Sequence, residues 1–178
     1  RIRVQLLAAR GYQKQSYFLH HMQRQLDKPI ATTAVKEGYL VGTTTAADLL
    51  SLSTAIAAAF ESDPKPISAY KALHSSRCYR SNLDIIIKTK QDEVVAFCLA
   101  WLDDKNKVGL LEPVGCHPKH RRLGLASAVV SAALKRLKSA GARSAVVYPI
   151  GDSSDAVELY RKCDFTAVAN DYDWTIAL

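Results

Sequence analysis

One short segment constrains the fold of this chain more than any other: an apolar run that leads through a basic loop into an amphipathic helix. The run covers residues 108–116, the loop follows from His117, and apolar residues recur at helical spacing from Leu125 onward. Gly141 then supplies a helix stop. The segment therefore predicts a strand, a tight loop and a long helix in direct succession.

The start of this expected helix is suited to bind an anion. The first turn of a helix leaves backbone N–H groups without partners and carries partial positive charge. Gly124 and Ala126 leave room for a close approach, and Lys119, Arg121 and Arg122 add positive charge. These residues indicate a diphosphate site; on their own they also fit a solvated basic loop that caps the helix.

The spacing of the loop residues carries a family resemblance. Arg121-x-x-Gly124-x-Ala126 resembles the (Arg/Gln)-x-x-Gly-x-(Gly/Ala) signature of the GNAT superfamily of acetyl-CoA-dependent N-acetyltransferases. The resemblance implies an α/β fold with a mixed (α+β) sheet, the GNAT acyl-CoA N-acyltransferase fold, whose central mixed sheet is splayed between strands 4 and 5 and flanked by helices. It also implies acetyl-CoA as cosubstrate, with its pyrophosphate held by Arg121, Arg122, Leu123, Gly124, Leu125, Ala126 and Ser127.

A second segment, residues 153–165, resembles the closing helix of the family, Asn-x-x-Ala-x-x-Leu-Tyr-x-Lys-x-Gly-Phe. Ser153 stands in place of Asn, and Asp164 replaces Gly at a position where Asp tolerates a left-handed C-cap. The resemblance implies that Ser153 contacts the coenzyme and that Tyr160 donates a proton to the leaving thiolate, which a phenol with a reference pKa of about 10 can do at neutral pH. The alternative for Tyr160 is a packed core tyrosine.

The amine acceptor must lose a proton, and Glu112 is the acidic residue in the strand before the loop. Alternation along that strand places Glu112 on the same side as Leu110 and Val114. If that side faces the cleft, partial desolvation raises the pKa of the carboxyl and makes Glu112 a base, directly or through a water. The alternatives are a salt-bridged or a substrate-positioning carboxylate. The family's strand-borne catalytic glutamate aligns with Leu110 instead, so Glu112 is not an inherited assignment.

The resemblance also assigns a role to the end of this strand. In the family a backbone amide of the fourth strand polarises the thioester carbonyl, and the matching segment here is Val114, Gly115 and Cys116. Pro113, and Pro149 after the next parallel strand, fit a point where two strands diverge, although prolines at ordinary strand ends look the same.

Composition agrees with an intracellular enzyme that binds a polyanion. The chain carries a formal net charge of +7 with 48% hydrophobic residues, and many of its basic residues surround the expected coenzyme site. No apolar run approaches the ~18 residues of a membrane span. Four cysteines without a Cys-x-x-Cys pair favour a reduced, cytoplasmic protein. We expect no nucleic-acid or membrane partner, no metal, a small-molecule or peptide amine as acceptor, and a homodimer as one option.

The order of elements from residue 38 to residue 178 follows the family. We expect strands at 39–44, 84–89, 93–102, 108–116 and 144–148, a final pair at 166–169 and 172–177, and acceptor-shaping helices at 46–60 and 67–78. The expected domains are therefore an N-terminal segment, 1–37, and a GNAT acetyltransferase domain, 38–178.

The N-terminal segment echoes the C-terminal one. Leu6 to Tyr12, followed by residues 16–22, resembles Leu159 to Phe165 and its strand, with Tyr12 opposite Phe165 and Leu7 opposite Tyr160. This indicates the tail of a preceding degenerate GNAT domain plus a linker, as in tandem-domain acetyltransferases, or an extension that adds a strand.

Two classes of function follow from these patterns. The first is an enzyme that transfers acetyl from acetyl-CoA to an amine by direct nucleophilic attack. The alternative is a catalytically degenerate GNAT-fold module that binds CoA or a protein partner, toward which Ser153, Asp164 and Leu110 point.

Overall fold

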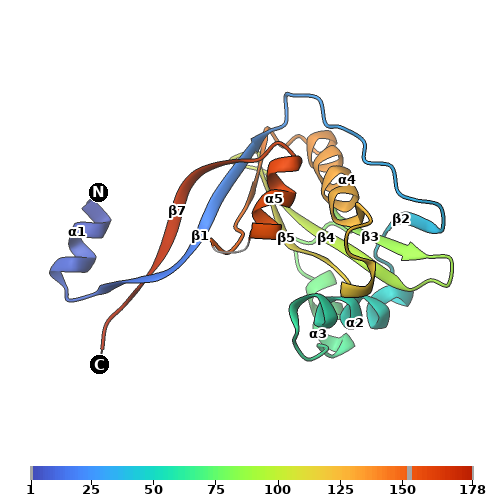
Figure 1. Ribbon diagram of the computed structural model, residues 1–178, viewed down its shortest axis with the longest axis horizontal. Helices are drawn as coiled ribbons and strands as arrows, with labels where there is room; N and C mark the ends of the chain where they lie inside the picture. The colour runs from blue at the N-terminus through green and yellow to red at the C-terminus, as the bar shows by residue number, and fades with distance from the viewer. Residues whose placement is uncertain (1, 152–153, 178) are drawn as a thin grey trace. The chain divides into compact units, whose positions relative to one another are not determined.

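The structure is a computed structural model that describes residues 2–151 and 154–177 (Figure 1). The chain divides into two compact units. One unit comprises residues 24–146, and the other comprises residues 1–23 together with residues 147–178.

The larger unit is built on a mixed sheet in the order β2-β3-β4-β5-β6. The strands β2 (Tyr39–Thr43), β3 (Asp84–Thr89), β4 (Val94–Asp103) and β5 (Val108–Cys116) form an antiparallel meander. β6 (Ser144–Val147) pairs in parallel with β5. The expected mixed α/β fold is confirmed.

Helices cover both faces of this sheet. α4 (Leu125–Ser139) packs on one face, where a Cβ on Gly109 would approach a methyl group of Leu137 to 2.4 Å. α2 (Leu49–Phe60) lies on the other face and buries Leu49 and Leu52 against Phe97. Because both faces are covered, β3 and β4 are apolar runs rather than alternating ones, with Ile85, Ile86 and Ile87 fully buried.

Local sequence signals begin and end these helices. A 3-10 turn, η1 (Ala46–Asp48), precedes α2, and Asp48 accepts hydrogen bonds from the backbone N–H and the hydroxyl of Thr45 at 2.9 and 2.7 Å. α4 ends before Gly141, which has a φ of +94° and terminates the helix as expected. α3 (Ile67–His74) is shorter than the expected helix at 67–78, and a second 3-10 turn, η2 (Ser81–Leu83), follows it before β3.

β5 and β6 diverge shortly after they begin to pair. Their parallel ladder joins residues 108–110 to residues 144–146 and ends at Leu110 and Val146, while β5 continues to Cys116. The expected splay between the fourth and fifth strands of the family order is therefore present in the sheet.

The smaller unit contains two helix–strand pairs, α1 (Ile2–Ala9) with β1 (Gln13–Gln25) and α5 (Ser154–Lys162) with β7 (Thr166–Thr175), and the two strands pair antiparallel. β7 is one continuous strand, so the expected final pair at 166–169 and 172–177 is wrong. The hydrogen-bonding partner of β7 is β1, which extends beyond the expected strand at 16–22 at both ends.

The two helix–strand pairs share one turn geometry. In the first, Gly11 N–H donates to Ala8 and Tyr12 N–H to Leu7. In the second, Asp164 N–H donates to Arg161 and Phe165 N–H to Tyr160, at the same spacing. Gly11 and Asp164 both have positive φ, 82° and 60°, which confirms the left-handed cap expected at Asp164. The similarity of the two segments thus extends from sequence to backbone.

Within residues 2–151 and 154–177, none of the helices is both long and apolar enough to cross a lipid bilayer.

Candidate active site

The loop between β5 and α4 presents an open helix N-terminus. η3 (Pro118–His120) follows β5, and Gly124 then takes a left-handed conformation with a φ of +78° at the N-cap of α4. No side chain from the described residues caps this end, and a Cβ on Gly124 would meet no described atom within 4 Å. The first backbone N–H groups of α4 therefore face accessible space, as an anion site requires.

The expected phosphate-binding residues divide into buried and accessible ones. Leu125 is buried and anchors the start of α4, whereas Leu123, Ala126 and Ser127 are half-buried and Gly124 is exposed. Arg121 and Arg122 are exposed, and Arg122 has a φ of +63°. The guanidinium of Arg121 donates a hydrogen bond of 3.2 Å to the carbonyl of Ala59 at the end of α2, which ties the loop to the helices on the opposite face of the sheet.

Polar contacts with neighbouring residues hold the loop between β5 and α4 in place. Nδ1 of His120 lies 2.9 Å from the Tyr39 hydroxyl on β2, and Nδ1 of His117 accepts a hydrogen bond of 3.3 Å from the backbone N–H of Lys119. The thiol of Cys116 donates to the carbonyl of His120 at 3.4 Å. His117 and His120 thus have structural contacts, His117 within the loop and His120 with β2.

Two amides at the end of β5 point into the splay. The backbone N–H of His117 donates to Val95 on β4, and successive N–H groups of a strand alternate in direction. The N–H groups of Val114 and Cys116 therefore point away from β4, to the side from which β6 has diverged. The N–H of Gly115 points toward β4, and its missing side chain admits Phe97, whose ring a Cβ would approach to 2.4 Å.

The expected alternation around Glu112 is wrong because β5 carries an irregularity. Leu110 pairs with Trp101, Leu111 with Ala100 and Val114 with Cys98, so Glu112 and Pro113 together lie opposite Leu99. Leu110 and Val114 consequently lie on opposite faces of the sheet. The Glu112 side chain is exposed. The role of Glu112 as a base was expected to depend on partial desolvation of its carboxyl, and the structure does not show that desolvation.

The remaining expected residues belong to the smaller unit. Tyr160 is 8% exposed, and its ring packs edge-to-face against Phe165 with the ring centroids 5.6 Å apart. Ser153 lies outside the described residues.

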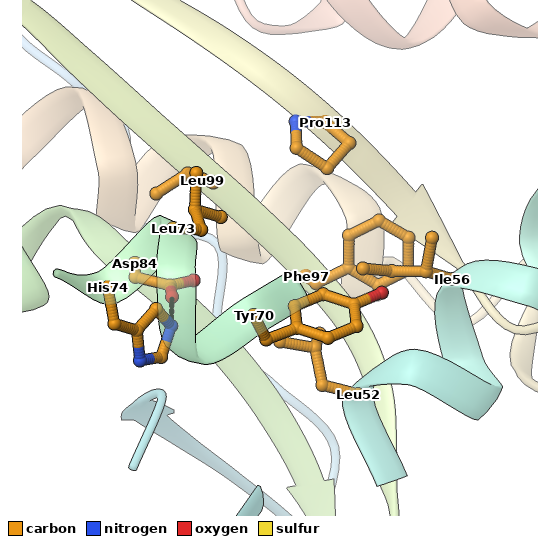
Figure 2. A pocket seen from close by; sticks show the side chains of 9 residues that line it. All are labelled: Leu52, Ile56, Tyr70, Leu73, His74, Asp84, Phe97, Leu99 and Pro113. Atoms are coloured by element: carbon orange, nitrogen blue, oxygen red, sulfur yellow. Dashed lines mark ion pairs between the residues drawn. The ribbon is translucent and has the colours of Figure 1, made fainter. Parts of the chain in front are cut away.

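The structure adds a polar cluster that the sequence analysis missed. A cavity of about 40 Å³ opens between α2, α3 and the sheet; we call it the α2–α3 cavity (Figure 2). Its lining residues are Leu52, Ile56, Tyr70, Leu73, His74, Asp84, Phe97, Leu99 and Pro113. At one end, Nε2 of His74 lies 3.5 Å from Oδ2 of Asp84, the ion pair marked in Figure 2.

Asp84 is the centre of this cluster. Its side chain is 5% exposed, and Oδ2 also accepts a hydrogen bond of 3.0 Å from the Tyr79 hydroxyl. The ring of Tyr79 stacks on that of His74, with the centroids 4.2 Å apart. Burial raises the pKa of the Asp84 carboxyl above its ordinary value, while Tyr79 and His74 act against the rise. A carboxyl directly before three isoleucines of a buried strand was the sequence signal for this residue.

Burial also raises the pKa of the Cys116 thiol, and the charge of Arg121 opposes this only partly. Cys116 is therefore held as a thiol rather than a thiolate, which disfavours it as a nucleophile.

Comparison with known proteins agrees with the family resemblance of the sequence. The family model described as "Acetyltransferase (GNAT) family" matches residues 51–165. Among solved structures, the chain is similar to a GCN5-related N-acetyltransferase from Sphaerobacter thermophilus, with a TM-score of 0.79 and 19% identity over 96% of this chain and 54% of that one. It is similar to a tandem GNAT protein from the clavulanic acid biosynthesis pathway, with a TM-score of 0.78 and 14% identity over 97% of this chain and 57% of that one.

A third similar structure is the ribosomal-protein-S18-alanine N-acetyltransferase from Escherichia coli, with a TM-score of 0.61 and 15% identity over 74% of this chain and 79% of that one. At these identities the structures establish the fold. The chain spans about half the length of the first two proteins. No curated protein sequence matches it.

Proposed function

We propose that this chain, which belongs to the acetyltransferase (GNAT) family, transfers an acetyl group from acetyl-CoA to an amine by direct attack of the amine nitrogen. The observation that carries the proposal is the uncapped start of α4 behind Gly124. Its backbone N–H groups, left-handed glycine and neighbouring arginines together have the chemistry that a diphosphate needs.

The residues present fit such a cosubstrate. The space over Gly124 is open where a phosphate oxygen would approach the first turn of α4, and Arg122 and Lys119 are exposed beside it. Arg121 already contacts Ala59, so we assign it to positioning the loop as well as to neutralising charge. Leu123, Ala126 and Ser127 border the same turn, and Ser153 is kept as a coenzyme contact by resemblance.

Acetyl-CoA, when bound, supplies the activated acetyl group. The N–H groups of Val114 and Cys116 are directed into the splay and are suited to polarise a carbonyl oxygen there. Tyr160 is proposed to give the proton that the leaving sulfur needs. The raised pKa of Cys116 supports direct attack rather than transfer through the enzyme's own thiol. Glu112 remains a candidate base, although its exposure does not favour it.

The domain assignment is also a proposal. We assign residues 38–178 to the acetyltransferase domain and residues 1–37 to the tail of a preceding GNAT-type domain plus a linker. The repeated cap geometry of α1–β1 and α5–β7 supports this. The absence of a Cys-x-x-Cys pair from the sequence supports a reducing, cytoplasmic environment.

The test is a calorimetric titration of the purified chain with acetyl-CoA, coenzyme A and dephospho-CoA, followed by acetylation of a panel of amines. Saturable binding and transfer to an amine support the proposal. Binding without transfer to any amine favours the degenerate CoA-binding module, and no binding refutes the phosphate-loop assignment.

A further inference from the structure

The antiparallel ribbon of β1 and β7 has an approximate two-fold symmetry (Figure 1). Each strand carries one irregularity in the ladder, and each irregularity lies close to the start of its own strand, at residues 14–18 of β1 and residues 167–169 of β7. Leu19 pairs with Asp171 near the middle of the ladder. A two-fold axis through this pair therefore relates β1 to β7, and with them the two helix–strand pairs that share one cap geometry.

The outer edge of β1, which faces away from β7, is occupied by the segment 149–151. The N–H of Gly151 donates to the carbonyl of Phe18, and the N–H of His20 donates to the carbonyl of Pro149, both at 2.9 Å. The backbone groups of a strand alternate in direction, so Leu19, between these two residues, faces β7.

The matching groups of β7 form an open edge. Because Asp171 faces Leu19, the backbone groups of Asn170 and Tyr172 point to the outer side of β7. β7 is the last strand of the sheet among the described residues, and none of the side chains from Thr166 to Thr175 is buried. The carbonyl of Asn170 and the N–H of Tyr172 thus hold the positions that, in β1, bind the segment 149–151. Such an edge can accept a further strand.

α1 lacks the cover that α5 has. The side chains of Val157 and Tyr160 on α5 are 6% and 8% exposed. Their counterparts on α1 are Val4, which is 50% exposed, and Leu7, which is half-buried. None of the residues of α1 from Ile2 to Ala9 is buried. A helix of this length and a two-stranded ribbon are marginally stable by themselves in water, so the Val4–Leu7 face requires a partner.

Resting on the domain assignment proposed above, we propose that the open edge of β7 and the Val4–Leu7 face of α1 together dock the sheet of a second GNAT-type domain in the same polypeptide. In this arrangement the counterpart of residues 149–151 donates an N–H to the carbonyl of Asn170 and accepts a hydrogen bond from the N–H of Tyr172. The ribbon of β1 and β7 then lies in the middle of one continuous sheet.

The symmetry also determines where this second domain lies in the polypeptide. Residues 149–151 lie shortly before α5 in the sequence, so their counterpart lies shortly before α1. A second copy of this chain that joins through β7 would cover the open edge, but it would supply no counterpart of residues 149–151 connected to α1. The repeated helix–strand pair therefore favours a preceding domain over a second copy.

The first test measures amide hydrogen exchange by NMR in the polypeptide as its gene encodes it. The amide of Asp171 faces β1 and serves as the internal reference, and the amide of Tyr172 reports on the open edge. We expect both amides to exchange slowly. Val4→Asp places a carboxylate on the docking face and should speed exchange at Tyr172 at least about tenfold. Gln5→Asp is the control, because the counterpart of Gln5 on α5 is the exposed Glu158.

A second pair of variants isolates one hydrogen bond. Tyr172→Pro and Tyr172→Ala both remove the ring that packs against Phe18, with the centroids 5.2 Å apart, but only proline also removes the N–H. Proline is compatible with an edge position whose N–H points outward. The amides of α1 should therefore exchange roughly 2- to 12-fold faster in Tyr172→Pro than in Tyr172→Ala.

Fast exchange of Tyr172 beside a slowly exchanging Asp171 overturns the docking surface. Protection of Tyr172 that rises with protein concentration assigns the edge to a second copy and overturns the proposed occupant. Equal effects of Val4→Asp and Gln5→Asp overturn the role of α1. A polypeptide without a second GNAT-type sheet contradicts the domain assignment itself, whereas a second sheet beside an unprotected Tyr172 contradicts this proposal alone. The acetyl-CoA titration tests the rest of the proposed function separately.

Discussion

Replacing Gly124 by leucine tests the phosphate-binding loop against a matched substitution at the other end of the same helix. Gly124 and Gly141 flank α4, have φ values of +78° and +94°, and offer a Cβ no described atom within 4 Å. A side chain in this backbone region costs about 1–2 kcal/mol at either site. For a chain of this size, both variants should therefore lose about 2–8 °C in melting temperature.

The two variants should differ in acetyl-CoA affinity. A leucine at 124 projects over the first turn of α4 and denies a phosphate at least one hydrogen bond to a backbone N–H. A hydrogen bond to a charged group contributes about 1.5–3 kcal/mol, which corresponds to a roughly 10- to 150-fold loss of affinity. Gly141→Leu should bind as the parent chain does in calorimetry. Parent-like affinity in Gly124→Leu, or an equal loss in both variants, would refute the reasoning.

Two further predictions concern catalysis and stability. Tyr160→Phe keeps the edge-to-face contact with Phe165 and should lower turnover on the order of 10²-fold with little change in acetyl-CoA affinity, as measured by steady-state kinetics; normal turnover would assign Tyr160 to packing alone. Burial raises the pKa of Asp48, but hydrogen bonds from Thr45 and Lys88 outweigh it and the net pKa is lowered. Asp48→Asn should therefore cost about 0.5–2 kcal/mol in urea unfolding at pH 7, a difference that begins to shrink as the pH falls below about 4 and is lost below the lowered pKa of the folded state; a difference that does not shrink on acidification would contradict the assignment.

The sequence predicted those parts of the fold whose signals are local. The strand, loop and helix from Val108 to Gly141 depend on an apolar run, a left-handed glycine and helical periodicity, each of which a short window contains. The cap at Asp164 was predictable for the same reason. By contrast, the continuity of β7 depends on pairing with β1 from the opposite end of the chain, and no local pattern records that pairing.

The same distinction explains the candidate site. The orientation of Glu112 was mispredicted because alternation assumes a regular ladder of strand pairs. The irregularity of β5 opposite Leu99 places Leu110 and Val114 on opposite faces of the sheet. His74 is the last residue of α3 and Asp84 is the first residue of β3. No sequence motif with a fixed spacing predicts that these two residues lie close together. Their proximity comes from the packing of α3 on the sheet.

The repeated helix–strand pairs differ in whether they carry a side chain that can act as an acid. Leu7 and Tyr160 accept equivalent hydrogen bonds in the caps of α1 and α5, so the two positions correspond in the backbone as well as in sequence. Leucine has no proton to donate, whereas tyrosine does. α1 keeps the glycine at its cap and lacks the phenol, while α5 has Asp164 at its cap and retains the phenol. If α1 and β1 end a GNAT-type domain, acid catalysis of the proposed kind is confined to the domain that contains Tyr160.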